Sequence, residues 1–310
     1  MLQLPTSNRK EGENNMQDRY AGDIGDFGKI GLLQELCNEG FHIGINWYKT
    51  VPDQQELKKQ DGRILIPEKY SSCNRQLYET LCNIKNSKRS IKELENADLI
   101  SNAVYYSDQV PVVGRTTWHK KALDVLSDVD LVFLDPDNGL LAKSVTKGSA
   151  QSVKYVFYEE VEDYLNNKQS VLIYSHRSRK KPKEYFDEIY GALSNIITKD
   201  KKTIYAISFP KGSVRDYFAI STNADHCERI RRTFETLAYG NLGDMGMCRL
   251  QPLPFQQCPH CGNHKLKPVL YGMPSHTAFE REEKGYIVLG GCCIEENAPK
   301  WMCSKCKRMF

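Results

Sequence analysis

One short stretch that directly follows an apolar run carries the residues best suited to chemistry, Asp135-Pro136-Asp137-Asn138-Gly139. The apolar run, Leu131-Val132-Phe133-Leu134, predicts a strand buried in a parallel sheet. An Asp at the carboxyl end of such a strand lies in the crevice where open α/β sheets bind ligands. Because Asp, Asn and Gly are also favoured in turns for backbone reasons, an ordinary Asx turn is the alternative. We predict Asp135, Asp137 and Asn138 as the catalytic group.

Two Cys-x-x-Cys pairs near the end of the chain have the spacing of metal ligands; they are Cys258, Cys261, Cys303 and Cys306. Two thiolates of one tight turn reach a single tetrahedral Zn²⁺, and two such turns make a zinc ribbon. Four thiolates fill the coordination sphere, so we expect a structural zinc ion. We expect the small β module that it stabilises to bind nucleic acid or a protein partner. Cys292 and Cys293 lie between the pairs; they could join a second site or exchange with a primary ligand, but we expect them to be buried and to bind no metal.

A run of cations follows the strand predicted over 170–175. Its members, predicted to contact nucleic acid, are His176, Arg177, Arg179, Lys180 and Lys181. Phosphate contacts are made by such side chains, although a solvated loop has the same composition.

Composition sets the class of protein. The chain has 310 residues, 40% of them hydrophobic, a net charge of +4 and 11 cysteines. This length can bury one substantial core and still carry a small second domain. No apolar run reaches the ~18 residues that span a bilayer, and the polar start has no secretory core, so we expect a soluble cytoplasmic protein without membrane contacts. The cysteines that bind no metal are then reduced.

The remaining pattern predicts alternating strands and helices. Strands are predicted at 41–47, 102–106, 130–134, 170–175, 203–209 and 217–222, and helices at 30–36, 77–82, 88–94, 118–126, 153–166 and 182–197. Residues 50–75 form a polar insertion without a clear pattern. We therefore predict a disordered lead-in (1–18), a doubly wound, mostly parallel α/β sheet of methyltransferase type with an antiparallel closing hairpin (19–250), and a zinc ribbon (251–310).

The glycine-rich segment near the start carries a family resemblance. Ala21-Gly22-Asp23-Ile24-Gly25-Asp26-Phe27-Gly28-Lys29 is similar to the segment that opens the ribosomal-RNA adenine-N6 methyltransferases of the J type and related partners of three-Cys-motif proteins. The order of later elements resembles that family over residues 18–240. The resemblance implies that S-adenosylmethionine is the cofactor, that Lys29 contacts its carboxylate end, and that Asp135 accepts hydrogen bonds from the target amine. The cofactor residues implied for this chain are Gly22, Asp23, Asp26, Lys29, Gly44 and Asp108.

Two departures from the family keep other functions open. Asp137 and Asn138 replace a Pro and a stacking aromatic ring, and the loop after the first strand has one glycine, Gly44, where several are expected. One alternative is a metal-dependent nuclease, in which Mg²⁺ or Mn²⁺ is bound by a cluster consisting of Asp23, Asp26, Asp135 and Asp137. The other is a catalytically silent protein that binds nucleic acid or a partner. Binding of S-adenosylmethionine separates the methyltransferase hypothesis from the nuclease and the silent binder. Dependence on a divalent metal separates the nuclease from the silent binder.

Overall fold

The computed structural model describes residues 18–51, 65–87, 89–196, 202–253, 256–263, 266–293, 295 and 297–310. The disordered lead-in predicted for 1–18 lies outside these residues, except for Asp18. Much of the polar insertion predicted for 50–75 also lies outside them; the part described contains a 3₁₀ helix, Glu68–Ser72.

The main sheet has seven strands in the order β2-β1-β3-β6-β8-β7-β9. Their bounds are β1 Ile43–Asn46, β2 Val104–Tyr106, β3 Leu131–Leu134, β6 Ser170–His176, β7 Thr203–Phe209, β8 Arg215–Ser221 and β9 Arg249–Gln251. β2, β1, β3 and β6 pair in parallel, whereas β8 is antiparallel to both β6 and β7. The predicted mixed α/β fold with a mostly parallel sheet and an antiparallel closing hairpin is therefore confirmed.

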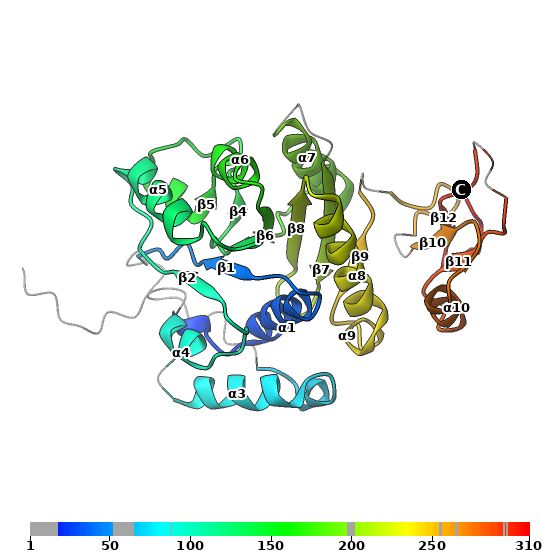
Figure 1. The fold of residues 1–310 in the computed structure, drawn as a ribbon, viewed down its shortest axis with the longest axis horizontal. Helices are drawn as coiled ribbons and strands as arrows, with labels where there is room; N and C mark the ends of the chain where they lie inside the picture. Colours follow the sequence, from blue (N-terminus) through cyan, green and yellow to red (C-terminus); the bar gives the residue numbers. More distant parts are fainter. Residues whose placement is uncertain are drawn as a thin grey trace, which may run out of the picture. The chain divides into compact units, whose positions relative to one another are not determined.

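Helices cover both faces of this sheet (Figure 1). The helices between Ile24 and Asp244 are α1 Ile24–Asn38, α3 Arg75–Asn86, α4 Ile91–Asn96, α5 Arg115–Val125, α6 Tyr158–Asn166, α7 Pro182–Asn195, α8 Ala224–Tyr239 and α9 Asn241–Asp244. α1 packs against α3 and α8, and α5 packs against α6 across the sheet from α1 (Figure 1). All four residues of β3 are fully buried, as the apolar run predicts.

α1 is longer than the sequence predicts, because the glycine-rich segment is helical. Asp23 caps the helix by accepting hydrogen bonds from the backbone N–H groups of Gly25 and Asp26, at 2.6 and 3.2 Å. The glycines allow close packing: a Cβ at Gly25 would lie 2.7 Å from the guanidinium of Arg215. Tertiary contacts thus overcome the low helix propensity of glycine.

The helix predicted over 153–166 is shorter than expected. A 3₁₀ helix, Ala150–Lys154, leads to β5, Tyr155–Val156, which pairs with β4, Gly139–Leu140. α6 begins only at Tyr158, where the Glu160 side chain accepts a hydrogen bond from the N–H of Phe157. The segment after Asp135 is therefore a small folded unit and not a simple turn.

The described chain divides into two compact units. One contains the residues up to Arg177 and Leu193–Arg249, and the other contains Ser178–Ala192 and Leu250–Phe310. The second unit has a three-stranded sheet in the order β11-β10-β12, formed by Val288–Leu289, Leu266–Leu270 and Trp301–Cys303, and the helix α10, His276–Glu283. Among the described helices, none combines the length and apolar character that a membrane span requires.

Candidate active site and metal centre

The direction of the strands locates the first candidate site. The carboxyl ends of β2, β1, β3 and β6 meet at one edge of the sheet because the four strands are parallel. β2 and β3 lie on opposite sides of β1, so the strand order reverses between β1 and β3. Such a reversal places a ligand-binding crevice between the carboxyl ends of the two strands. Asp135 follows β3 directly there, and its N–H donates to the carbonyl of Asn46, the last residue of β1, at 3.0 Å.

Lys29 of α1 binds the Asp135 carboxylate at this edge. Its Nζ lies 2.7 Å from Oδ2 of Asp135 and 3.2 Å from Oδ1 of Asp26, one turn earlier on α1. The Lys29 side chain is 13% exposed and that of Asp135 9%. The structure thus brings the predicted site residue Asp135 to Lys29 and Asp26, two others that lie more than 100 positions earlier in the sequence.

Burial and the ion pair act in opposite directions on these groups. Burial raises the pKa of Asp135 to about 6, although Lys29 acts to lower it. Burial by itself would lower the pKa of Lys29, but Asp135 and Asp26 outweigh it and hold that pKa above its usual range. At neutral pH the pair is therefore an ammonium and a carboxylate, and Asp135 can accept hydrogen bonds.

Strand register places aromatic rings beside Asp135. Leu134 of β3 pairs with Asn46 of β1 and Ile173 of β6, so the next positions, Trp47 and Tyr174, flank Asp135 on the same face. Tyr174 pairs in turn with Tyr217 of β8, and their rings meet edge to face at 5.8 Å. Tyr217 is fully buried, and its hydroxyl has no hydrogen-bond partner among the described residues. Burial raises the pKa of Tyr217 above its usual range, so the hydroxyl keeps its proton.

The glycine-rich segment continues the site toward β8. Gly22 donates its N–H to Oδ2 of Asp26 at 2.9 Å, and the Asp23 carboxylate lies 3.6 Å from the guanidinium of Arg215. Burial, and then the neighbouring Asp26, raise the pKa of Asp23 to about 6. Gly22, Asp23 and Asp26 therefore lie with Lys29, as the resemblance implies, but Arg215 is a member of the cluster that the sequence did not predict.

Asp137 and Asn138 make contacts with the neighbouring loops, whereas Asp135 pairs with Lys29. The hydroxyl of Thr50 donates to Oδ2 of Asp137 at 2.7 Å, which ties the loop after β3 to the loop after β1. Asn138 uses its backbone: its N–H donates to the carbonyl of Lys154, and its carbonyl accepts from the N–H of His176. These bonds fix the backbone at Asn138, and the predicted catalytic role of its side chain stays a prediction.

Two further residues predicted to bind the cofactor have other contacts. Gly44 lies within β1, where a Cβ would come within 2.9 Å of Val129, so packing alone accounts for the glycine, and its predicted cofactor contact stays a prediction. Asp108 follows β2 at the correct edge, is exposed, and accepts a 3.4 Å hydrogen bond from the Tyr106 hydroxyl. Its predicted contact with a cofactor adenine stays a prediction.

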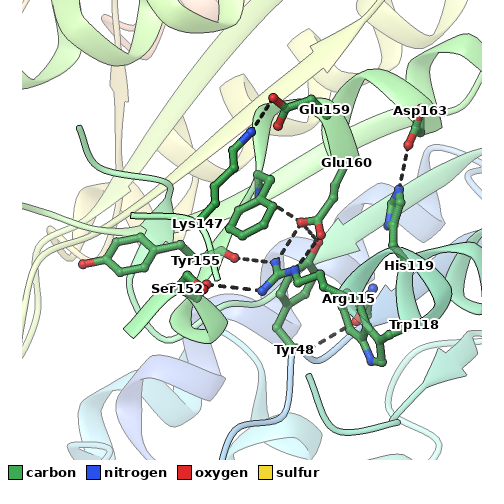
Figure 2. Close-up of polar contacts among 12 residues, drawn as sticks. Tyr48, Arg115, Trp118, His119, Lys147, Ser152, Tyr155, Glu159, Glu160 and Asp163 are labelled. Atoms are coloured by element: carbon green, nitrogen blue, oxygen red, sulfur yellow. Dashed lines mark hydrogen bonds and ion pairs between the residues drawn. The ribbon is translucent and has the colours of Figure 1, made fainter. Parts of the chain in front are cut away.

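A buried ion pair supports the loop after β1, as Figure 2 shows. Arg115, the first residue of α5, donates to both carboxylate oxygens of Glu160 at 2.7 and 2.8 Å and also to the carbonyls of Ser152 and Tyr155. The Tyr48 hydroxyl donates to Glu160 at 3.1 Å. Tyr48 has a φ of 48°, a left-handed conformation that is rare for an aromatic residue. This cluster, which no sequence motif revealed, fixes the turn that ends β1.

The residues of the predicted basic run differ in their contacts and exposure. Arg177 forms a bidentate ion pair with the buried Asp216, so its guanidinium is held inside the protein and is a poor candidate for a phosphate contact. Lys180 pairs with Glu188 on α7. The other three, His176, Arg179 and Lys181, are exposed. Although His176 is exposed to solvent overall, partial desolvation of its ring, and then Arg215, lower its pKa below the usual value.

The four predicted cysteines converge in the second unit. Their sulfur atoms all lie within 4.8 Å of one another, with Cys258 and Cys306 at 3.4 Å and Cys261 and Cys303 at 3.5 Å. Tetrahedral zinc with Zn–S bonds of ~2.3 Å requires sulfur separations of roughly 3.8 Å, so the group can hold a metal ion such as Zn²⁺.

Local backbone geometry prepares both turns for a metal. Gly262 and Lys307, which follow the second cysteine of each pair, have φ values of 66° and 60°. Burial would raise the pKa of Cys303, but hydrogen bonds from the N–H of Cys306 and the side chain of Asn263 contribute to lowering it to about 6. Cys292 and Cys293 are exposed and lie outside the group, so the prediction that they are buried was wrong.

No protein-family model and no curated protein matches this chain. The resemblance to the adenine-N6 methyltransferases is therefore a prediction from Ala21–Lys29 and Asp135-Pro136.

Proposed function

We propose that this chain is an S-adenosylmethionine-dependent methyltransferase that acts on an exocyclic amine of nucleic acid. The observation that carries the proposal is the position of Asp135, which lies at the carboxyl end of β3 where the strand order reverses. A ligand bound in that crevice meets the Asp135 carboxylate at its inner end. The closing hairpin, with β8 inserted between β6 and β7, is the arrangement that a methyltransferase-type sheet predicts.

The chemistry needs an acceptor that orients the amine. Methyl transfer forms a bond from the amine nitrogen to the methyl carbon as the bond from carbon to the sulfonium breaks, and the nitrogen then passes a proton to the Asp135 carboxylate. A carboxylate that accepts an N–H hydrogen bond directs the nitrogen lone pair and stabilises the positive charge that develops on nitrogen. Asp135 is ionised at neutral pH and can do both.

S-adenosylmethionine supplies the methyl group when it is bound. Its amino-acid end carries one positive and one negative charge, and the site offers both signs in Asp23 and in Arg215. In a methyl-donor loop, glycines let the chain turn after the first strand. Here Tyr48 makes that turn in a left-handed conformation, so the turn does not need the glycines that the sequence lacks. These features suit the cofactor and support the proposal.

The arrangement disfavours the metal-dependent nuclease. The Lys29 ammonium lies between Asp26 and Asp135, where a divalent cation would have to bind. Within the described ranges, the four cysteines are the one group of three or more candidate ligands close enough to hold an ion.

We assign zinc in the second unit a structural role, because a shell of four thiolates leaves no position for substrate. The module then serves to bind nucleic acid or a protein partner. The exposed cations Arg179 and Lys181 suit phosphate contacts in the same unit.

Transfer of tritium from labelled S-adenosylmethionine to total RNA and to total DNA tests the proposal. We expect Asp135→Asn to lower the rate about 100-fold or more, because the amide cannot accept the proton or carry the charge. Asp137→Asn is the matched control and should retain most activity, since the introduced amide oxygen can still accept the Thr50 hydrogen bond. Equal loss in the two variants, or full activity of Asp135→Asn, would contradict the assignment.

A further inference from the structure

The surroundings of the Lys29 ammonium resemble a receptor for an amine. Besides the two carboxylates, the ring of Trp47 lies 5.5 Å from Nζ and the ring of Tyr174 lies 6.0 Å from it. Two carboxylates and two aromatic faces attract positive charge on nitrogen. The ammonium is thus an N–H donor at hydrogen-bond distance from the same oxygen that the proposed function assigns to the target amine.

Both rings are held in place by their neighbours. Trp47 stacks on Tyr105 with an interplanar angle of 5°, and its Nε1 donates to Glu95 at 2.8 Å. Tyr174 packs edge to face on Tyr217. Each ring therefore has contacts besides Lys29 that hold it in place, and we expect the receptor to persist without the ammonium.

We propose that Lys29 Nζ occupies the binding position of the target amine, and that Trp47 and Tyr174 are the aromatic faces that line this position. The ligand class is an aromatic primary amine of a nucleobase, which displaces the Lys29 ammonium from Asp135 and acquires positive charge on nitrogen as the methyl group is transferred. The two rings then supply, from the ends of β1 and β6, the aromatic surface that Asn138 cannot provide. This inference rests on the proposed function for the identity of the ligand, but the receptor itself is testable without methyl transfer.

Chemical rescue of Lys29→Ala tests the receptor. Alanine keeps the β-carbon, so the atoms removed correspond to propylammonium. We expect propylammonium to raise the melting temperature of Lys29→Ala by about 2–4 °C more than that of the wild type, in which the position is filled. n-Propanol, which has the same stem without charge, should produce no such difference at the same concentration.

Two variants serve as controls. Lys121→Ala removes an exposed lysine of α5 and should respond to propylammonium as the wild type does. In Lys29→Ala combined with Asp135→Asn, the rescue should be lost. If Lys29→Ala does not fold by itself, recovery of folded protein on refolding with propylammonium, and not with n-propanol, is the supporting result. A response of Lys29→Ala no larger than that of Lys121→Ala, or no recovery on refolding, overturns the receptor.

Adenosine and inosine monophosphates test the ligand class, because one carries an exocyclic amine where the other carries oxygen. We expect the adenine nucleotide to stabilise Lys29→Ala more than the inosine nucleotide does, and to stabilise it more than the wild type. Equal stabilisation by the two overturns the nucleobase assignment. If propylammonium rescues Lys29→Ala but the protein transfers no methyl group, the receptor is supported and the methyltransferase proposal is refuted. If the protein transfers methyl groups but propylammonium does not rescue the variant, the methyltransferase proposal is supported and the receptor is refuted.

Discussion

Replacement of Arg115 by Met should destabilise the sheet unit strongly. Arg115 is held in the cluster of Figure 2, where its guanidinium also lies 4.1 Å from the centroid of the Phe157 ring. Methionine retains the apolar stem but removes four hydrogen bonds, of which two go to Glu160. The Glu160 side chain is 6% exposed, so among the described residues the variant leaves this buried carboxylate with the Tyr48 hydroxyl and the Phe157 N–H as its donors.

The size of the effect follows from that uncompensated charge. Removal of one partner of a buried ion pair costs about 3–5 kcal/mol of unfolding free energy. In a domain of roughly 150–250 residues this loss lowers the melting temperature by about 6–20 °C. Glu160→Gln removes the charge but keeps an acceptor, so the double variant should be more stable than the two single losses predict, with a coupling of about 1–3 kcal/mol.

Urea unfolding followed by circular dichroism measures these values for the wild type, the two single variants and the double variant. Arg75→Met is the control, because Arg75 pairs with Glu79 on an exposed helix face and should change the free energy by less than ~1 kcal/mol. A loss below ~1 kcal/mol for Arg115→Met, or strict additivity in the double variant, would refute the reasoning.

Three further predictions concern other parts of the chain. Metal analysis should find one zinc ion per chain, and Cys303→Ser should lose it and unfold the second unit in calorimetry while the transition of the sheet unit persists; protein without zinc would contradict the site. Tyr217→Phe should raise the free energy of unfolding by about 1 kcal/mol, because it removes a buried hydroxyl without a partner among the described residues; a decrease in the urea midpoint would show that the hydroxyl is satisfied. Asp23→Asn should remove a pH dependence of the free energy of unfolding. The pKa of Asp23 is raised to about 6, so the stability it contributes is full below about pH 4 and is lost as the pH rises through 6. The total loss is roughly 3 kcal/mol. Asparagine keeps the N-cap, so the variant should gain on the wild type between pH 4 and 7; parallel stability curves would argue against the raised pKa.

The elements that sequence predicted well are those governed by local pattern. The apolar run before Asp135 predicted β3, and the spacing of the cysteines predicted their convergence, because both signals are contained in a few adjacent residues. α1 was predicted too short, because its early glycines are stabilised by contacts with β7 and β8 that lie almost 200 residues away in sequence.

The candidate site could be predicted only in part for the same reason. Asp135 and Lys29 were identified separately, but their ion pair depends on how α1 packs on the sheet. Arg215, and the pairing of Arg115 with Glu160, have no signature in sequence, since each partner is an ordinary residue of its own element. For Gly44, the sequence could not show that packing against Val129 by itself requires a glycine, because that neighbour comes from a distant segment of the chain.

The insertion of β8 between β6 and β7 has a consequence for synthesis of the chain on the ribosome. β6 ends at His176, and the strand that covers its second edge begins only at Arg215. Because the ribosome adds ~5–20 residues per second, this edge of β6 stays unpaired for a few seconds before β8 is synthesised. During this time β6 exposes unpaired backbone groups and the apolar residues Val171, Leu172 and Ile173, a combination that templates pairing between chains. Chaperone demand and aggregation of nascent chains should therefore be greatest for chains halted between β6 and β8.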